Sequence, residues 1–445
     1  MKYETIKSIV LLILVVFSIL LTWMLWTYQP NYDTLKESGN TVEEVSLGET
    51  KELSKIVRPE RLFLHQGEKH YGTFDSFEID QTMKELSLWG FSEFEDISEL
   101  VKNIPSFIYD KNALELIFPD IVPLKEYRSA LQLPSNDIPK SNFDRIVIDL
   151  EPETREGGVV YFISSKEHEV LRAYVSASYI NDFKERYLVD ISGNEKFALY
   201  EPINRESFAM LRKEPVKIAL YKHLTVNLST EKLRGALFSD PNVVSKNYSS
   251  FGEEYTDTTT LLSINNETNT VSYVKTEDVE SETTTKSSHL LEKSIDFINS
   301  HGGWTDNYRY VGMDESEQVI LFRLYDLNGY PIFGDNGISE ILQMWNASGI
   351  NKYFRSNFML GRRLEATEIT LPSGISVLEE LKKVEDVDLD FLQDLTIGYH
   401  MSKVTETEIT QNSLIYLEPA WYYKYNDEWK MVPSSENGGI KHGLE

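Results

Sequence analysis

The sequence predicts an α+β protein, with an N-terminal transmembrane helix followed by a multi-domain ectodomain of antiparallel sheets and helices. Residues 8–27 form an uncharged run of 20 residues, which as a helix spans a bilayer core of about 30 Å. Beyond this run, short strands joined by tight turns alternate with amphipathic helices, which is typical of α+β rather than doubly wound parallel folds. The chain has 445 residues, 41% of them hydrophobic, enough for about two to three domains.

Composition excludes several classes of function. The 44 basic and 71 acidic residues give a net charge of −27, which argues against a nucleic-acid partner because phosphates need Lys and Arg. There is no cysteine, so disulfides, Cys-ligated zinc and thiol catalysis are excluded.

The N-terminal segment predicts a single-pass protein of the cell membrane. Lys2 and Lys7 precede the apolar run, and the positive side stays in the cytoplasm, so the bulk of the chain is expected outside. The alternative, a cleaved signal peptide, needs small residues at its cleavage site, whereas this run ends in Trp-Thr-Tyr-Gln-Pro. Rings at the outer end are assigned as membrane-interface anchors: Trp23, Trp26 and Tyr28.

Ser18 and Thr22 are possible helix–helix contacts. They are four residues apart and share one helix face, and small or hydroxyl side chains let helices approach closely in lipid. The alternative, that both are merely tolerated and bond their own backbone, stays open. The predicted segments up to this point are a cytoplasmic tail (1–7), a transmembrane anchor (8–28) and a polar juxtamembrane stalk (29–56).

The ectodomain is divided into an N-terminal part (57–200), a middle domain (201–288) and a C-terminal domain (289–445). In the first, Asp80 is expected to cap a helix, and strands are expected at 143–150, 159–163 and 170–175. In the middle part, we expect a strand at 217–221, a helix opened by Ser229 or Thr230, a hairpin over 258–275 and a polar linker at 276–288.

The C-terminal part has the clearest pattern. Leu291, Ile295 and Ile298 predict a helix that ends at the glycines 302–303. Strands follow at 318–325 and 332–333 around an Asn-Gly turn, and then at 338–345 and 350–358. Ser376 and Glu379 fit a capping box, and three or four strands close the chain, the last near 429–432.

No motif in the sequence indicates a catalytic or metal site. The eight histidines are scattered, and His65 and His70 are five apart, which does not suit one helix face. Two S-x-x-K matches, beginning at Ser229 and Ser272, lack the companion motifs of penicillin-binding enzymes. They are better explained as a helix cap and a strand residue. The sequence therefore predicts no catalytic residue, no metal ligand and no bound cofactor, although counting alone does not exclude a carboxylate pair.

Two further patterns have structural interpretations. Asp386, Asp388 and Asp390 resemble the start of a calcium loop, but Phe391 stands where that loop needs Gly and Ile397 where it needs Glu. The aromatic run 420–425 is a possible sugar platform, but alternate rings of a strand pair that fill a core are the favoured interpretation.

Three segments resemble the YycH family of Gram-positive bacteria: 113–124 (ALELIFPDIVPL), 327–334 (LNGYPIFG) and 417–421 (LEPAW). The second and third also resemble the sister family YycI and PepSY-like modules, which implies a YycI/PepSY-like C-terminal domain. The resemblance implies a non-catalytic, membrane-anchored regulator that works with YycI. It would bind and restrain the WalK (YycG) sensor histidine kinase, which controls cell-wall metabolism. Two other functions stay open: an exported cell-wall enzyme, and a structural component of the wall-synthesis machinery.

Overall fold

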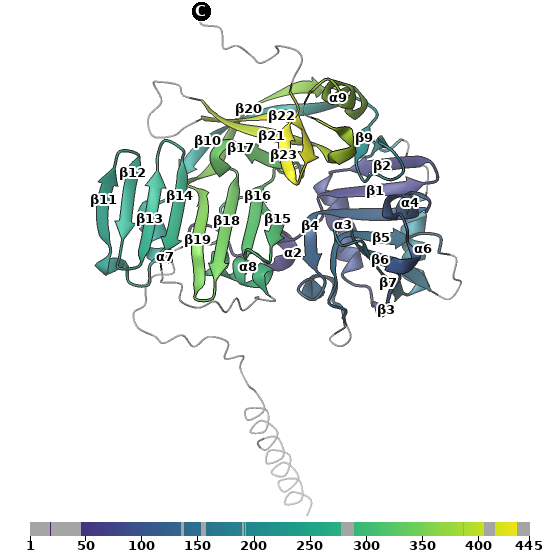
Figure 1. Ribbon diagram of the computed structural model, residues 1–445, viewed down its shortest axis with the longest axis horizontal. Coiled ribbons are helices and arrows are strands. Elements are labelled where there is room, and N and C mark those ends of the chain that lie inside the picture. Colours follow the sequence, from purple (N-terminus) through teal and green to yellow (C-terminus); the bar gives the residue numbers. More distant parts are fainter. Residues whose placement is uncertain are drawn as a thin grey trace, which may run out of the picture. The chain divides into compact units, whose positions relative to one another are not determined.

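The computed structural model describes residues 46–134, 138–152, 157–188, 191, 193–276, 289–385, 387–404 and 414–433, together with Ser18. Its strands form three largely antiparallel sheets of nine, eight and six strands (Figure 1). The predicted α+β class is confirmed.

The nine-stranded sheet is built by the N-terminal part of the chain and has a core on each face. Along β5, Ile146 and Ile148 enter the larger core, which α3 and α6 cover, and Val147 enters a smaller core with α4. Both faces are therefore buried, which explains why this strand carries three consecutive apolar residues, Ile146 to Ile148. In spatial order the strands are β3 (Ser92–Asp96), β7 (Glu169–Val175), β6 (Gly158–Ser164), β5 (Asn142–Asp149), β4 (Ala113–Pro123), β1 (Arg61–Gln66), β2 (Lys69–Thr73), β8 (Ala198–Pro202) and β9 (Met210–Arg212), with helices α3 (Ser76–Leu86), α4 (Ile104–Tyr109), α5 (Arg128–Leu131) and α6 (Ala177–Tyr187).

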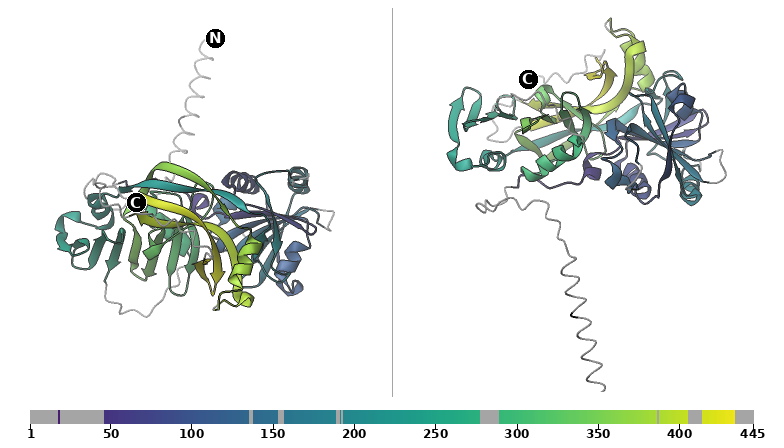
Figure 2. Two further views of the ribbon diagram at one scale, coloured as in Figure 1. Left: turned by 90° about the horizontal axis from the view of Figure 1, so that it is seen from above. Right: turned by 60° about the horizontal axis from the view of Figure 1, so that its bottom comes forward.

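The eight-stranded sheet combines strands from both sides of the predicted boundary at 288. Gln343, fully buried on β18, donates a 3.2 Å hydrogen bond to the carbonyl of Ser294 in α8, and this helix is seen against the sheet in Figure 2. The strands in spatial order are β11 (Ser245–Ser249), β12 (Gly252–Thr256), β13 (Thr260–Asn265), β14 (Thr270–Lys275), β19 (Gly349–Ser356), β18 (Glu340–Asn346), β16 (Val319–Leu324) and β15 (Tyr308–Asp314), with helices α7 (Thr230–Leu237) and α8 (Leu290–Ser300).

The six-stranded sheet contains the longest strands. It includes one parallel pair, in which Phe333 of β17 lies opposite His400 of β21. Its strands are β17 (Ile332–Gly334), β21 (Leu392–Val404), β22 (Leu414–Tyr425), β10 (Val216–Asn227) and β20 (Phe358–Leu371), with β23 (Glu428–Met431) beside β22 and helix α9 (Gly374–Leu381) preceding β21.

The folded part begins earlier than the predicted stalk allows. The backbone N–H groups of Leu47 and Gly48 both donate to the carbonyl of Gly302, and Ile56 of helix α2 (Leu53–Ile56) is fully buried. The start expected near Val57 is therefore wrong by about ten residues, because a few apolar side chains anchor a segment whose overall composition is polar.

Two of the three predicted helix caps need correction. Asp75, not Asp80, caps α3 by accepting a hydrogen bond from the N–H of Glu78; Asp80 lies inside the helix and pairs with Arg58. Ser373, not Ser376, caps α9. Ser229 caps α7 as expected.

The predicted hairpins are present, with one difference in pairing. The turn at 326–330 forms, and Gly329 has the positive φ of 98° that favours glycine there. The segment that returns from it does not continue as the hairpin partner of β16. Beyond the single bridge between Tyr325 and Pro331, β17 pairs with β21 instead.

No helix within the described residues is long and apolar enough to cross a membrane. The predicted anchor lies outside those residues except for Ser18, which is helical and exposed. The anchor stays a prediction.

Candidate functional site

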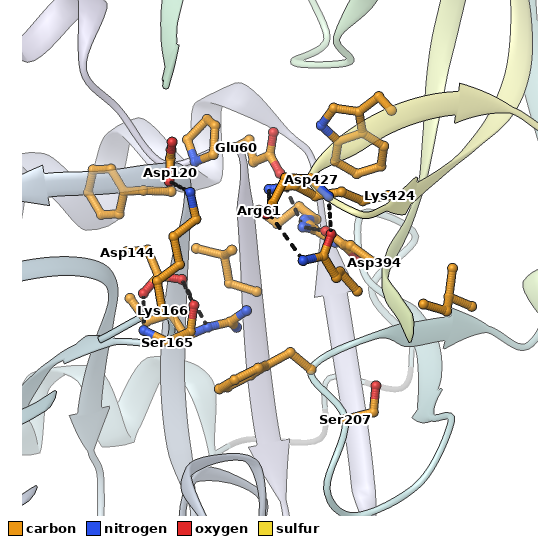
Figure 3. Close-up of a pocket in the computed structure, with 18 of the residues that line it drawn as sticks. Glu60, Arg61, Asp120, Asp144, Ser165, Lys166, Ser207, Asp394, Lys424 and Asp427 are labelled. Carbon is orange, nitrogen blue, oxygen red and sulfur yellow. Dashed lines mark hydrogen bonds and ion pairs between the residues drawn. The ribbon is translucent and has the colours of Figure 1, made fainter. Parts of the chain in front are cut away.

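A polar hollow of about 590 Å³ lies where the three sheets meet. Residues of the nine-stranded sheet and its turns form one side, and β16, β17, β21 and the β22–β23 turn form the other (Figure 3). Charged side chains dominate its lining, which includes Glu60, Arg61, Asp120, Asp144, Arg145, Lys166, Arg323, Asp394, Lys424 and Asp427.

Arg61 joins the sheets at the floor of the hollow. From the start of β1 its Nη1 donates to Asp394 of β21 at 3.0 Å, and a second Arg61–Asp394 contact makes the pair bidentate. Glu60 lies 3.1 Å from the same guanidinium and accepts a 3.0 Å hydrogen bond from the hydroxyl of Tyr325, beyond β16. Burial alone lowers the pKa of Arg61, but the charges of Asp394 and Glu60 outweigh it and the pKa is raised.

A second group of paired charges lies on β4, β5 and the β6–β7 turn, on the side of the hollow that the nine-stranded sheet forms. Lys166, in the β6–β7 turn, contacts Asp120 at 2.6 Å. Asp144 accepts 2.6 Å hydrogen bonds from both the N–H and the hydroxyl of Ser165. These turns are held in place by their own side chains, so the wall is preorganised.

Behind the hollow lies a buried network that the sequence did not reveal. His65 and His70 are cross-strand neighbours in the β1–β2 hairpin, with 2.8 Å between their Nδ1 atoms. Glu115 of β4 contacts His65 Nε2 at 2.9 Å and Arg145 at 2.5 Å. The prediction that the histidines are scattered is wrong for this pair, which lies together in the interior at 0% and 5% exposed.

Electrostatics fix the charge states of this network. Burial raises the pKa of Glu115, but Arg145 and His65 outweigh it and lower the pKa to about 2. Burial, with a smaller effect of the neighbouring His65, lowers the pKa of His70 to about 4. Glu115 is therefore charged and His70 neutral at physiological pH.

His70 makes stability depend on pH. An unfolded His takes up a proton near pH 6.5, whereas the folded His70 resists until about pH 4, so the unfolded state binds more protons between those values. We expect this group to remove about 2 kcal/mol of folding free energy between pH 7.5 and 5. Urea unfolding of His70→Gln should show that much less pH dependence. The exposed His289→Gln should keep the full dependence, and equal slopes in the two variants would contradict the assignment.

The residues singled out from the sequence do not converge on one site. Thr22, Trp23, Trp26, Tyr28 and Asp386 lie outside the described residues. Asp388 caps a short 3₁₀ turn at 389–391, and in the described part of the chain no group of three His, Asp or Glu residues is placed to hold a metal ion. Trp421, Tyr422 and Tyr423 of the aromatic run are buried, each at most 6% exposed, and Tyr422 also lines a smaller, second hollow.

Comparison with known families identifies the chain. Residues 4–188 match the model of the YycH protein N-terminal domain, and residues 206–439 match that of the YycH protein C-terminal domain. Together these models cover most of the sequence, so the chain belongs to the YycH family, as its resemblance predicted.

Individual relatives agree. The chain is 28% identical over 464 aligned positions to the two-component system WalR/WalK regulatory protein YycH of Bacillus subtilis (strain 168), covering 100% of this chain and 99% of the relative. It superimposes on the crystal structure of YycH from Bacillus subtilis with a TM-score of 0.71 and 23% identity, covering 87% of this chain and 99% of that chain. The structural similarity shows that the two chains share a fold.

Proposed function

We propose that this protein is a non-catalytic, membrane-anchored regulator of the WalK sensor histidine kinase that acts together with YycI and restrains the kinase. The observation that carries the proposal is the full-length match to a relative named as a WalR/WalK regulatory protein. We further propose that residues 8–28 are the anchor, that the bulk of the chain lies outside the cell, and that the C-terminal part is YycI/PepSY-like.

Physical reasoning limits how such a protein can act. An ectodomain outside the membrane cannot touch a cytoplasmic kinase core, so it must bias the kinase through its membrane helix or its outer sensor region. A bias requires the regulator to bind one kinase state more tightly than the other. The anchor supplies one contact surface through Ser18 and Thr22, where an interhelical hydrogen bond is worth about 0.6–2 kcal/mol.

The test is capture in membranes. The full-length protein, crosslinked within the membrane and purified from detergent, should bring down the kinase and YycI. Replacing Ser18 and Thr22 by Leu should reduce that capture several-fold and raise output of the kinase regulon, while the protein still sediments with carbonate-washed membranes.

A membrane helix of scrambled sequence and equal hydrophobicity tests whether the positions of Ser18 and Thr22 matter. It should behave like the double variant. Capture of septal wall-synthesis proteins in place of the kinase would overturn the proposal in favour of a structural role. Unchanged regulon output on deletion of the protein would overturn it as well. Normal regulation by the scrambled helix would contradict the role of Ser18 and Thr22 and move specificity to the ectodomain.

A further inference from the structure

We propose that the hollow between the sheets continues into a longer groove that holds an extended, basic segment of a partner protein. This deepens the proposed function, because it names the chemistry of a segment that the regulator would hold. Its test uses peptides alone, and it is therefore independent of the kinase.

The groove consists of two adjoining hollows. The second, of about 480 Å³, shares Arg323, Phe333, Asp427 and Trp429 with the first and adds residues of β18, β21, β22 and β23. A continuous channel of this kind suits an extended chain rather than a compact ligand. Its middle is aromatic, because the rings of Phe333 and Tyr422 stack at 3.9 Å and Trp429 lies 5.9 Å from Phe333.

The unneutralised charge in the groove is negative. Its cations have acidic partners within the protein: Asp394 holds Arg61, Asp120 holds Lys166, Glu115 holds Arg145 and Glu340 holds Arg323. The fifth, Lys424, lies 3.9 Å from Asp427.

Three further acids line the groove. Glu206, Asp335 and Asp390 are exposed, and within the described residues none of them forms an ion pair. Asp427 is 67% exposed and only distantly paired. A ligand that complements this groove therefore carries positive charge.

A buried polar group also points to a ligand. Tyr422 is 3% exposed, yet its hydroxyl has no hydrogen-bond partner among the described residues, and the residue lines the second hollow. An unsatisfied buried hydroxyl costs about 1–3 kcal/mol. A donor or acceptor on a bound peptide backbone would satisfy it.

The neighbouring strand favours a peptide. Among the described strands, β23 pairs only with β22, and its Glu428, Trp429 and Met431 line the second hollow. Within the described residues no strand pairs with its other edge, so the N–H and C=O groups there would suit an added strand. Such a strand would place alternate basic side chains near Asp335 and Asp427, and a cation on the face of Trp429 is favourable.

The experiment titrates the full-length protein in detergent with fluorescein-labelled ten-residue peptides and follows anisotropy. A peptide of alternating Lys and Val should bind at least tenfold more tightly than one of alternating Glu and Val, and its affinity should fall as salt rises. The variant Asp335→Asn with Asp427→Asn should lose tenfold or more, and Tyr422→Phe about threefold or more.

The matched control is Glu99→Gln with Glu267→Gln, which removes the same charge from exposed positions outside the groove and should bind as the parent does. Equal binding of both peptides, or equal loss in the control and groove variants, would overturn the proposal. Binding of an uncharged N-acetylglucosamine tetramer in place of the basic peptide would overturn it too, and would assign the groove to sugars. None of these results bears on kinase capture, so a failure here is distinguishable from a failure of the proposed function.

Discussion

Glu115→Ala is expected to lower the free energy of unfolding by about 3–5 kcal/mol, the usual cost of removing one partner from a buried ion pair. Glu115 is 1% exposed and lies between His65 and Arg145. Without its carboxylate, the guanidinium of Arg145 loses its closest acidic partner in a buried site and keeps the 3.6 Å contact to Asp144 and its place 4.0 Å from the centre of the Phe208 ring. Urea unfolding at pH 7.5, followed by tryptophan fluorescence, measures the change.

An exposed ion pair of equal length provides the control. Glu95 contacts Arg172 at 2.5 Å across β3 and β7, but its side chain is 53% exposed, and such pairs contribute about 0–1 kcal/mol. Glu95→Ala should therefore leave stability nearly unchanged. If Glu115→Ala lost as little stability as is expected for Glu95→Ala, the buried network would not stabilise the fold.

The same variant has a pH signature. Because the folded pKa of Glu115 is depressed to about 2, its contribution is complete above the unfolded pKa near 4.5 and is lost as pH falls from there towards 2. The parent should therefore lose stability over this acid range, and Glu115→Ala should lose correspondingly less.

Local sequence signals predicted much of the fold. The apolar, strand-favouring residues at 159–163 and 170–175 correctly predicted two strands, which pair as the β6–β7 hairpin, and the spacing of Leu291, Ile295 and Ile298 correctly predicted α8. These elements are specified by neighbours in sequence. Strand β20 was missed beyond 358, because its exposed, charged residues lack the alternation that identifies a half-buried strand.

The candidate site could not be predicted in this way. Arg61 and Asp394 are 333 positions apart, and no periodicity links residues that only tertiary packing brings together. The His65–His70 pair offered a weaker signal that was available. A separation of five positions with Gly67 in between fits a hairpin whose side chains face each other, although it does not fit one face of a helix. The family resemblance predicted a regulator, and although its segments contain Asp120 and Phe333 of the hollow, it assigned no role to either residue.

Arg61→Ala is expected to destabilise the junction of the three sheets by about 3–5 kcal/mol. Arg61 belongs to the nine-stranded sheet, and Glu60 lies in the loop just before it. Tyr325 directly follows β16 of the eight-stranded sheet, and Asp394 belongs to the six-stranded sheet. Removing the guanidinium leaves two carboxylates whose side chains are 8% and 16% exposed, without their cation. Asp394→Ala should cost less, because Arg61 keeps Glu60 at 3.1 Å.

An exposed ion pair provides the comparison for the buried Arg61–Asp394 pair. Arg205 and Asp110 also form a close ion pair, but their side chains are 68% and 63% exposed, so Arg205→Ala should change stability by less than about 1 kcal/mol.

Hydrogen exchange is the second measurement. Arg61→Ala should speed exchange in the first half of β21, which contains Asp394, while the β6–β7 hairpin, whose contacts lie within the nine-stranded sheet, keeps its protection. Equal acceleration everywhere would show a global loss of stability in place of a loosened junction, and no acceleration at β21 would mean that Arg61 does not hold the sheets together.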